Sequence, residues 1–111
     1  MSRSTSRKFA LLLALVIIAA TPLLAADAAA GKTIFDKRCK MCHAADGSGN
    51  QGMAKALGTT IQNLGSPEVQ KMSDADIKMI ITKGKGKMKP VSGLSDADID
   101  NVIAHVRTFK K

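Results

Sequence analysis

Cys39-Lys40-Met41-Cys42-His43 is the stretch of sequence that decides the fold. The pattern Cys-x-x-Cys-His is typical of a site at which a c-type haem is attached to the chain. Two thiols at this spacing can meet the two vinyl groups of one porphyrin, and the next residue then carries its imidazole over the ring. The sequence therefore predicts one haem c, covalently bound through Cys39 and Cys42, with His43 as an axial ligand of the iron.

Three other uses of the cysteine pair remain open at this point. The thiols could form a disulfide in an oxidising compartment, act as a thioredoxin-like redox pair, or supply half of a zinc site. The redox pair is disfavoured because the chain shows no βαβ pattern. The zinc site is disfavoured because it needs more ligands than His43 and His105 readily supply.

The N-terminal region has the order of regions found in a secretory signal peptide. A basic start is followed by an apolar run over residues 9–20 and by small residues up to position 30. Ala26-Asp27-Ala28 offers an A-x-A cleavage site. The sequence predicts a signal peptide over residues 1–28, cleaved near positions 26–30. A retained membrane anchor is the alternative, because residues 9–26 approach the lower limit of a spanning helix.

The composition of the remaining part, residues 29–111, fits one small domain that needs help to form a core. The chain has 17 Lys and Arg against 9 Asp and Glu, no Trp or Tyr, and three Phe. Nucleic-acid binding is the usual suspicion for a basic chain, but the secretion signal and the lack of stacking aromatics argue against it. A surface that docks an acidic protein fits the charge better.

Helical periodicity and capping patterns predict an all-α fold. The first helix is expected over residues 28–41, and a short helix could occupy 51–57. Ser73 and Ser95 each begin a Ser-x-x-Asp pattern that resembles a capping box before an apolar run. The last helix carries an apolar stripe at helical spacing, formed by Ile99, Val102, Ile103, Val106 and Phe109.

Met88 stands out among the methionines because it lies in a lysine-rich loop, residues 83–90, where glycines and a proline forbid regular helix. Such a methionine has no obvious core to enter. Met53 is its main rival for an approach to the haem, since it also lies close to flexible sequence.

These motifs together resemble the class I c-type cytochromes over almost all of residues 29–111. The resemblance includes Gly31 and Phe35, the haem motif, Met88 in its loop and the amphipathic C-terminal helix. It implies a small cytochrome c fold with three to five short helices around one haem. It also implies that His43 and Met88 are the axial ligands, and that Gly31 lets the first and last helices cross closely.

Two positions depart from the family pattern. Lys89 separates Met88 from Pro90, where the ligand methionine commonly precedes proline directly. His105 occupies a position in the last helix at which an aromatic residue is usual. We expect His105 to stack at the helix crossing and not to bind iron.

The signal peptide predicts a protein that is periplasmic or otherwise exported and soluble after cleavage. Together with the resemblance, it predicts a monomeric one-electron carrier that is not an enzyme and reaches membranes only through its partners. The lysines at positions 83, 85, 87 and 89 are expected to form a cationic rim for acidic redox partners. One alternative is a haem-bearing subunit of a larger membrane oxidoreductase. A haem peroxidase or gas sensor is a further alternative, which would need an open iron position.

Overall fold

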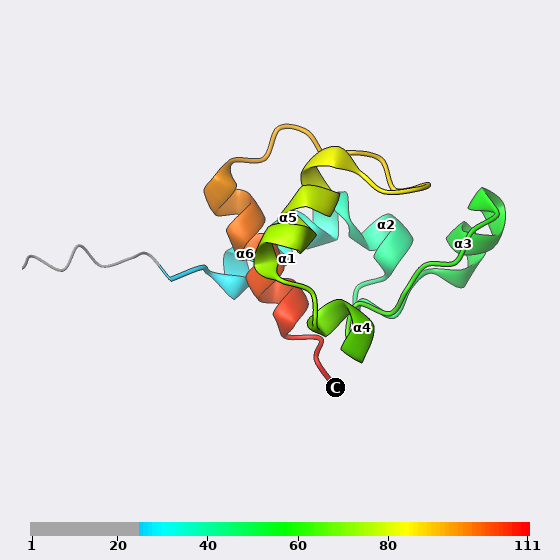
Figure 1. The fold of residues 1–111 in the computed structure, drawn as a ribbon, viewed down its shortest axis with the longest axis horizontal. Helices are drawn as coiled ribbons and strands as arrows, with labels where there is room; N and C mark the ends of the chain where they lie inside the picture. Colours follow the sequence, from blue (N-terminus) through cyan, green and yellow to red (C-terminus); the bar gives the residue numbers. More distant parts are fainter. Residues whose placement is uncertain (1–24) are drawn as a thin grey trace, which may run out of the picture.

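The computed structural model describes residues 25–111, which form six helices and no strand. The predicted all-α class is confirmed. Most of the predicted signal peptide, residues 1–24, lies outside the described residues. In chain order (Figure 1) the helices are α1 (Ala28–Arg38), α2 (Lys40–His43), α3 (Gln51–Leu57), α4 (Pro67–Gln70), α5 (Asp74–Lys83) and α6 (Asp96–Arg107).

The helices α5 and α6 begin at the two serines that the sequence singles out. The Ser73 hydroxyl accepts a hydrogen bond from the Asp76 amide, and the Ser95 hydroxyl accepts one from the Asp98 amide. In α6 the Asp98 carboxylate also accepts a bond from the Ser95 amide, which completes a reciprocal capping box. Similar sequence starts therefore give the same helix boundary with different degrees of capping.

The predicted first helix is divided into α1 and α2 at Cys39, whose backbone leaves helical geometry with φ −121°. The short helix α4 is not among the predicted helices. Its start nevertheless carries a recognisable signal, because Ser66 caps it and Pro67 occupies its first turn. The structure thus contains one-turn helices that apolar periodicity does not reveal.

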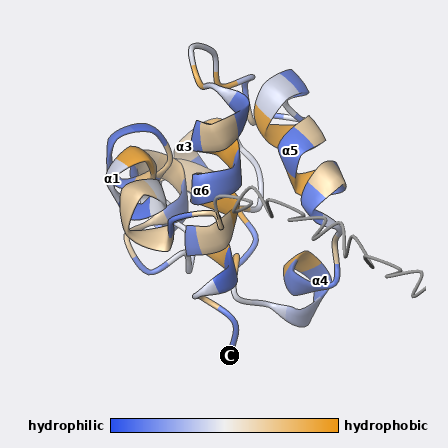
Figure 2. Cartoon of the chain, turned by 90° about the vertical axis from the view of Figure 1, so that its left-hand side faces the viewer, coloured by the Kyte–Doolittle hydropathy of each residue, from blue (hydrophilic) through white to orange (hydrophobic). Residues whose placement is uncertain are grey.

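The hydrophobic core lies where α1, α5 and α6 meet. Figure 2 shows hydrophobic residues on the sides of α5 and α6 that face each other. Phe35 of α1 is almost completely buried, with 1% of its surface exposed. The other core residues are Ile77, Ile81, Ile99, Val102, Ile103 and Val106. Most of the stripe predicted on the last helix is therefore core.

A close backbone contact joins α1 to α6 at Gly31. A Cβ atom on Gly31 would lie 1.8 Å from the Asn101 carbonyl oxygen, a distance that no side chain can occupy. The expected close crossing is therefore present, and it requires glycine because the contact is made by backbone and not by a movable side chain.

Aromatic rings fill the space beside this crossing. The ring of His105 packs edge-on against Phe35 at 5.1 Å and against Phe109 at 4.8 Å between centroids. Burial lowers the pKa of His105, so the neutral imidazole is favoured at this position. His105 therefore takes the place of an aromatic residue in the core, as expected.

Arg107 joins the C-terminal end of α6 to α4 and α5. Its guanidinium donates to the Asp74 carboxylate at 2.7 Å and to the carbonyl oxygens of Gln70 and Met72. The Gln70 amide in turn donates to the carbonyl oxygens of Leu64 and Val106. These bonds fix the segment that leads into α5.

No helix within residues 25–111 combines the length and the apolar composition that crossing a membrane requires.

We expect Gly31→Ala to destabilise the haem-loaded protein by about 3 kcal/mol or more, because the added methyl group overlaps backbone atoms of α6. Gly52→Ala is the matched control, since Gly52 is also helical and its Cβ would meet nothing closer than 3.4 Å. Thermal unfolding of both variants measures the difference. Equal midpoints for the two would show that the crossing is not tightly packed.

Candidate functional site

The haem motif is carried on a single helical turn that follows α1. The Cys39 amide donates to the Phe35 carbonyl oxygen at 2.8 Å, and the His43 amide donates to the Cys39 carbonyl oxygen at 3.0 Å. Residues three and four positions apart lie on one side of a helical turn. Cys39, Cys42 and His43 are therefore presented to the same side, and all three line one cavity.

Hydrogen bonds of Asn50 connect the haem motif to α3. Its backbone amide donates to the Cys42 carbonyl oxygen at 2.9 Å, and its side-chain amide donates to the Met41 carbonyl oxygen at 3.2 Å. Its side-chain oxygen also caps α3 by accepting a bond from the Met53 amide. Sequence reasoning missed this residue; an Asn directly before a helical segment was the available signal.

The chain leaves the motif through a strained residue, Ala44. Its backbone has φ 65° and ψ 159°, and it is the only non-glycine residue with positive φ in the described part of the chain. Such a conformation costs free energy and persists where surrounding contacts impose it. The Gly49 amide, which donates to the His43 carbonyl oxygen at 2.8 Å, is one of those contacts.

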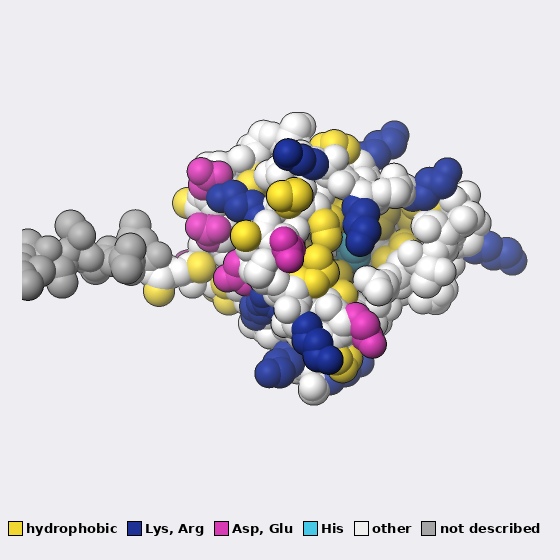
Figure 3. Space-filling view, in the orientation of Figure 1, with side chains coloured by type: hydrophobic (Ala, Val, Ile, Leu, Met, Phe, Trp, Pro, Cys, Tyr) yellow, Lys and Arg dark blue, Asp and Glu magenta, His cyan; other side chains and the backbone are white. Residues whose placement is uncertain are grey.

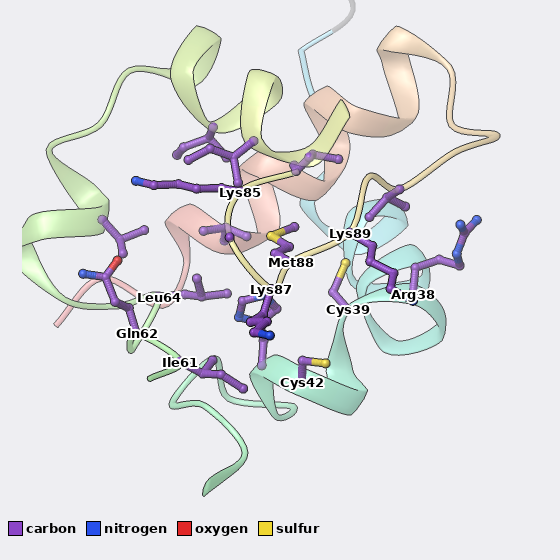
Figure 4. A pocket seen from close by; sticks show the side chains of 18 of the residues that line it. Arg38, Cys39, Cys42, Ile61, Gln62, Leu64, Lys85, Lys87, Met88 and Lys89 are labelled. Carbon is purple, nitrogen blue, oxygen red and sulfur yellow. The ribbon is translucent and has the colours of Figure 1, made fainter. Parts of the chain in front are cut away.

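The cavity has a volume of about 760 Å³ and is largely apolar. Figure 4 shows Cys39 and Cys42 beside it, with Ile61 and Leu64 from the loop before α4 along another wall. Leu57 of α3 lines it as well. The remaining apolar walls come from α4, α5 and α6 through Val69, Ile77, Ile80, Ile81, Val102 and Val106. Its size is within the range of cofactor pockets.

The donor atoms around the cavity fit a haem. The thiols of Cys39 and Cys42 are free, and burial raises the pKa of Cys39 to about 11, so its thiol is not a ready thiolate. Burial also lowers the pKa of His43, which favours the neutral imidazole that binds metals. The His43 Nδ1 atom is buried without a hydrogen-bond partner among the described residues, as is the Nε2 atom of His105.

Other metal chemistry finds less support. Residues 25–111 contain no group of three or more His, Cys, Asp or Glu side chains that could hold a metal ion. This argues against the zinc alternative. His105 is not among the residues that line the cavity and lies in the aromatic cluster at the helix crossing instead.

Met88 lies in a tight turn whose backbone is closed on itself. The Lys85 amide donates to the Met88 carbonyl oxygen at 3.0 Å, and the Met88 amide donates back to the Lys85 carbonyl oxygen at 2.9 Å. Gly84 makes this turn possible, because its φ is 75° and a Cβ would lie 2.6 Å from the Met88 carbonyl oxygen. Met88 is half-buried, packs on the core and lines the cavity.

Met88 shares the cavity with three other methionines, namely Met41, Met53 and Met72. Met79 of α5 is 55% exposed and does not line the cavity. The axial role of Met88 therefore stays a prediction, supported by its fixed turn and not by exclusion of the others.

Three of the four predicted rim lysines stand at the cavity. Lys85, Lys87 and Lys89 are exposed and line it, whereas Lys83 is exposed but does not. Arg38 also lines the cavity and donates to the Ser92 carbonyl oxygen at 3.0 Å. Figure 3 shows cationic side chains spread around the hollowed side of the molecule, while acidic side chains gather nearer the described N-terminal end.

Comparison with known proteins agrees with this chemistry. Residues 26–106 match the protein family described as "Cytochrome C oxidase, cbb3-type, subunit III". A protein named cytochrome c6 from Picosynechococcus sp. is 40% identical over 101 residues, covering 85% of this chain and 83% of the relative. Cytochrome c-554(547) from Halothiobacillus neapolitanus is 35% identical over 92 residues, covering 78% of this chain and the whole relative.

Among solved structures, one titled KustC0563 c-type cytochrome is similar with a TM-score of 0.63 and 30% sequence identity. The likeness covers 73% of this chain and 98% of that one.

We expect the double substitution Cys39→Ser, Cys42→Ser to abolish covalent haem attachment, because no other cysteine is present to form a thioether. The denatured protein, matured in a host that attaches haem c, should then have the mass of the polypeptide alone. Each single substitution should retain haem through the remaining thiol, in lower yield. Covalent haem in the double variant would contradict the assignment.

Proposed function

The chain belongs to the c-type cytochromes and binds haem c covalently, and from this we propose that it is a diffusing one-electron carrier with His43 and Met88 as axial ligands. The observation that carries the proposal is one apolar cavity that combines a Cys-x-x-Cys-His turn with a methionine on a fixed loop. Haem, when bound, supplies an iron that can take up and release one electron.

The cysteines and the histidine would hold the group. Cys39 and Cys42 would hold it through thioether bonds to its two vinyl groups, each thiol supplying both the sulfur and the hydrogen that a vinyl group takes up. The His43 imidazole would bind the iron. Because the three residues share one helical turn fixed by Asn50, their relative positions stay nearly constant during electron transfer.

Met88 would give the second axial ligand. A thioether is a soft ligand that favours the reduced metal and raises the reduction potential. With both axial positions filled by side chains, small molecules have no open position at which to react. This supports a carrier over a peroxidase or a gas sensor, and over an enzyme in general.

The walls of the cavity have a separate task, which is to exclude water. Their isoleucine, leucine and valine side chains lower the polarity around the haem, which tunes its potential. Electron transfer then needs only that one haem edge reaches the surface, where the partner approaches. No bond to a substrate is made or broken in this scheme.

Lys85, Lys87 and Lys89 are proposed to receive acidic redox partners at the cavity. Three like charges around the exposed haem edge would steer an oppositely charged protein into brief encounters. We further propose that the protein is a monomer that binds no nucleic acid and meets membranes only through its partners.

Export to the periplasm is part of the proposal. It is supported by the order of basic, apolar and small residues at the N-terminus, although residues 1–24 lie outside the described part of the chain.

A second candidate is a haem-bearing subunit of a membrane oxidoreductase. It is favoured by one observation, the description of the matched family as subunit III of an oxidase. The two functions differ in the fate of the N-terminus: a subunit anchored by its apolar run would be purified from membranes with residues 1–24 intact. A diffusing carrier would be recovered from the periplasm without them.

We expect Met88→Ala to abolish the weak long-wavelength band that iron–sulfur ligation gives in the ferric spectrum, and to lower the reduction potential. Cyanide should then bind more readily at neutral pH, because one iron position is open. The controls are Met53→Ala, which also lines the cavity, and Met79→Ala, which does not. Loss of the band in Met53→Ala and not in Met88→Ala would transfer the axial role to Met53.

We also expect the triple substitution of Lys85, Lys87 and Lys89 by Gln to slow reduction by an acidic protein such as reduced flavodoxin about tenfold at low ionic strength. The dependence on salt should flatten as well. Substitution of Lys71, Lys110 and Lys111 by Gln makes the same change in net charge away from the cavity. Equal rates for the two triple variants would show that the three cavity lysines have no special part in docking a partner.

A further inference from the structure

Asp27 is the residue that starts α1, and its contacts reach beyond that helix. Its carboxylate accepts hydrogen bonds from the amides of Ala29 at 2.9 Å and Ala30 at 3.1 Å. Its own amide donates to the Asn101 side-chain oxygen at 2.8 Å, across to α6. Asp27 therefore caps one helix and ties its start to the other.

These bonds lie next to the close approach of α1 and α6 at Gly31. Asn101 is also the residue whose carbonyl oxygen presses against Gly31. The Gly31 amide donates to the Asp27 carbonyl oxygen at 2.9 Å, which makes this bond part of the first turn of α1. Loss of Asp27 would thus loosen the crossing of α1 and α6 at its N-terminal side.

The sequence motif for signal-peptide cleavage conflicts with this arrangement. Ala26-Asp27-Ala28 directs the cut to the bond after Ala28, and the sequence also allows a cut after Ala26 or after Ala30. A cut after Ala28 or Ala30 would remove the cap. It would also place a new positive charge within the first turn of α1, at the positive end of the helix dipole.

A cut before Asp27 avoids both effects. The new ammonium group would then lie outside the helix, and the Asp27 carboxylate would stand between it and the first turn. Asp100 lines the same surface depression as Asp27 and adds negative charge there. Ala25 or Ala26 would still supply a small residue directly before the cut.

We propose that processing leaves Asp27 in the mature protein, with the cut at the Ala25–Ala26 or the Ala26–Asp27 bond. The inference rests on the export part of the proposed function. The mature chain would then begin at residue 26 or 27 and not, as the cleavage motif predicts, at residue 29. The reason is that Asp27 caps α1 and links it to Asn101.

The mass of the haem-loaded protein tests the proposal. The full chain, with its own N-terminus, is expressed in a bacterial host that matures c-type cytochromes, and the periplasmic product is measured intact and by N-terminal sequencing. A start at Ala26 or Asp27 is expected. A start at Ala29 or Gly31 overturns this inference alone, whereas a product that retains residues 1–24 overturns the export proposal as well.

The structural reason is tested separately by Asp27→Ala, with the start of each product verified by mass. We expect its thermal unfolding midpoint to fall by roughly 5 °C, the shift for loss of one helix cap in a domain of this size. Asp27→Ser should recover most of it, because serine also caps. Asp36→Ala is the control, as it removes an acid from the same helix that only pairs with exposed Lys32. A midpoint for Asp27→Ala no lower than that of Asp36→Ala would overturn the structural reason.

Discussion

The close approach of α1 and α6 at Gly31 is the constraint on which the rest of the structure depends. It sets the position of the end of α1, from which Cys39 and the following turn project towards the cavity. It also brings α6 near enough for Val102 and Val106 to serve both the core and the cavity wall. A larger residue at position 31 would move the helix end, and the cysteines with it, so the glycine acts on the site from outside it.

The segments that form the site are held in place by different kinds of interaction. The turn of the haem motif is held by backbone bonds and by Asn50, and the Met88 turn is closed by its reciprocal bonds with Lys85. The walls between them are apolar side chains without directional bonds. Such a division fits a redox site, in which ligands must stay in place while the surroundings keep water out.

Much of the fold could be predicted because local rules decide it. The spacing of Cys39, Cys42 and His43 specifies one helical turn. The capping patterns at Ser73 and Ser95 mark where α5 and α6 begin. The rest depends on tertiary contacts that have no local pattern. Asn50 acts through carbonyl oxygens that only the folded loop brings near, and four methionines reach the cavity, so loop context alone cannot select Met88. The cap formed by Asp27 was hidden by a cleavage motif on the same residues.

The placement of α3 has a consequence for the wall of the cavity. Figure 1 shows α3 apart from the α1, α5 and α6 group, and the buried residues of the main hydrophobic cluster all belong to that group. Met53 and Leu57 of α3 nevertheless line the cavity, together with Ile61 of the loop that follows. Side chains in this wall can therefore be exchanged, and the polarity beside a bound group tuned, while the packing of the main cluster stays the same.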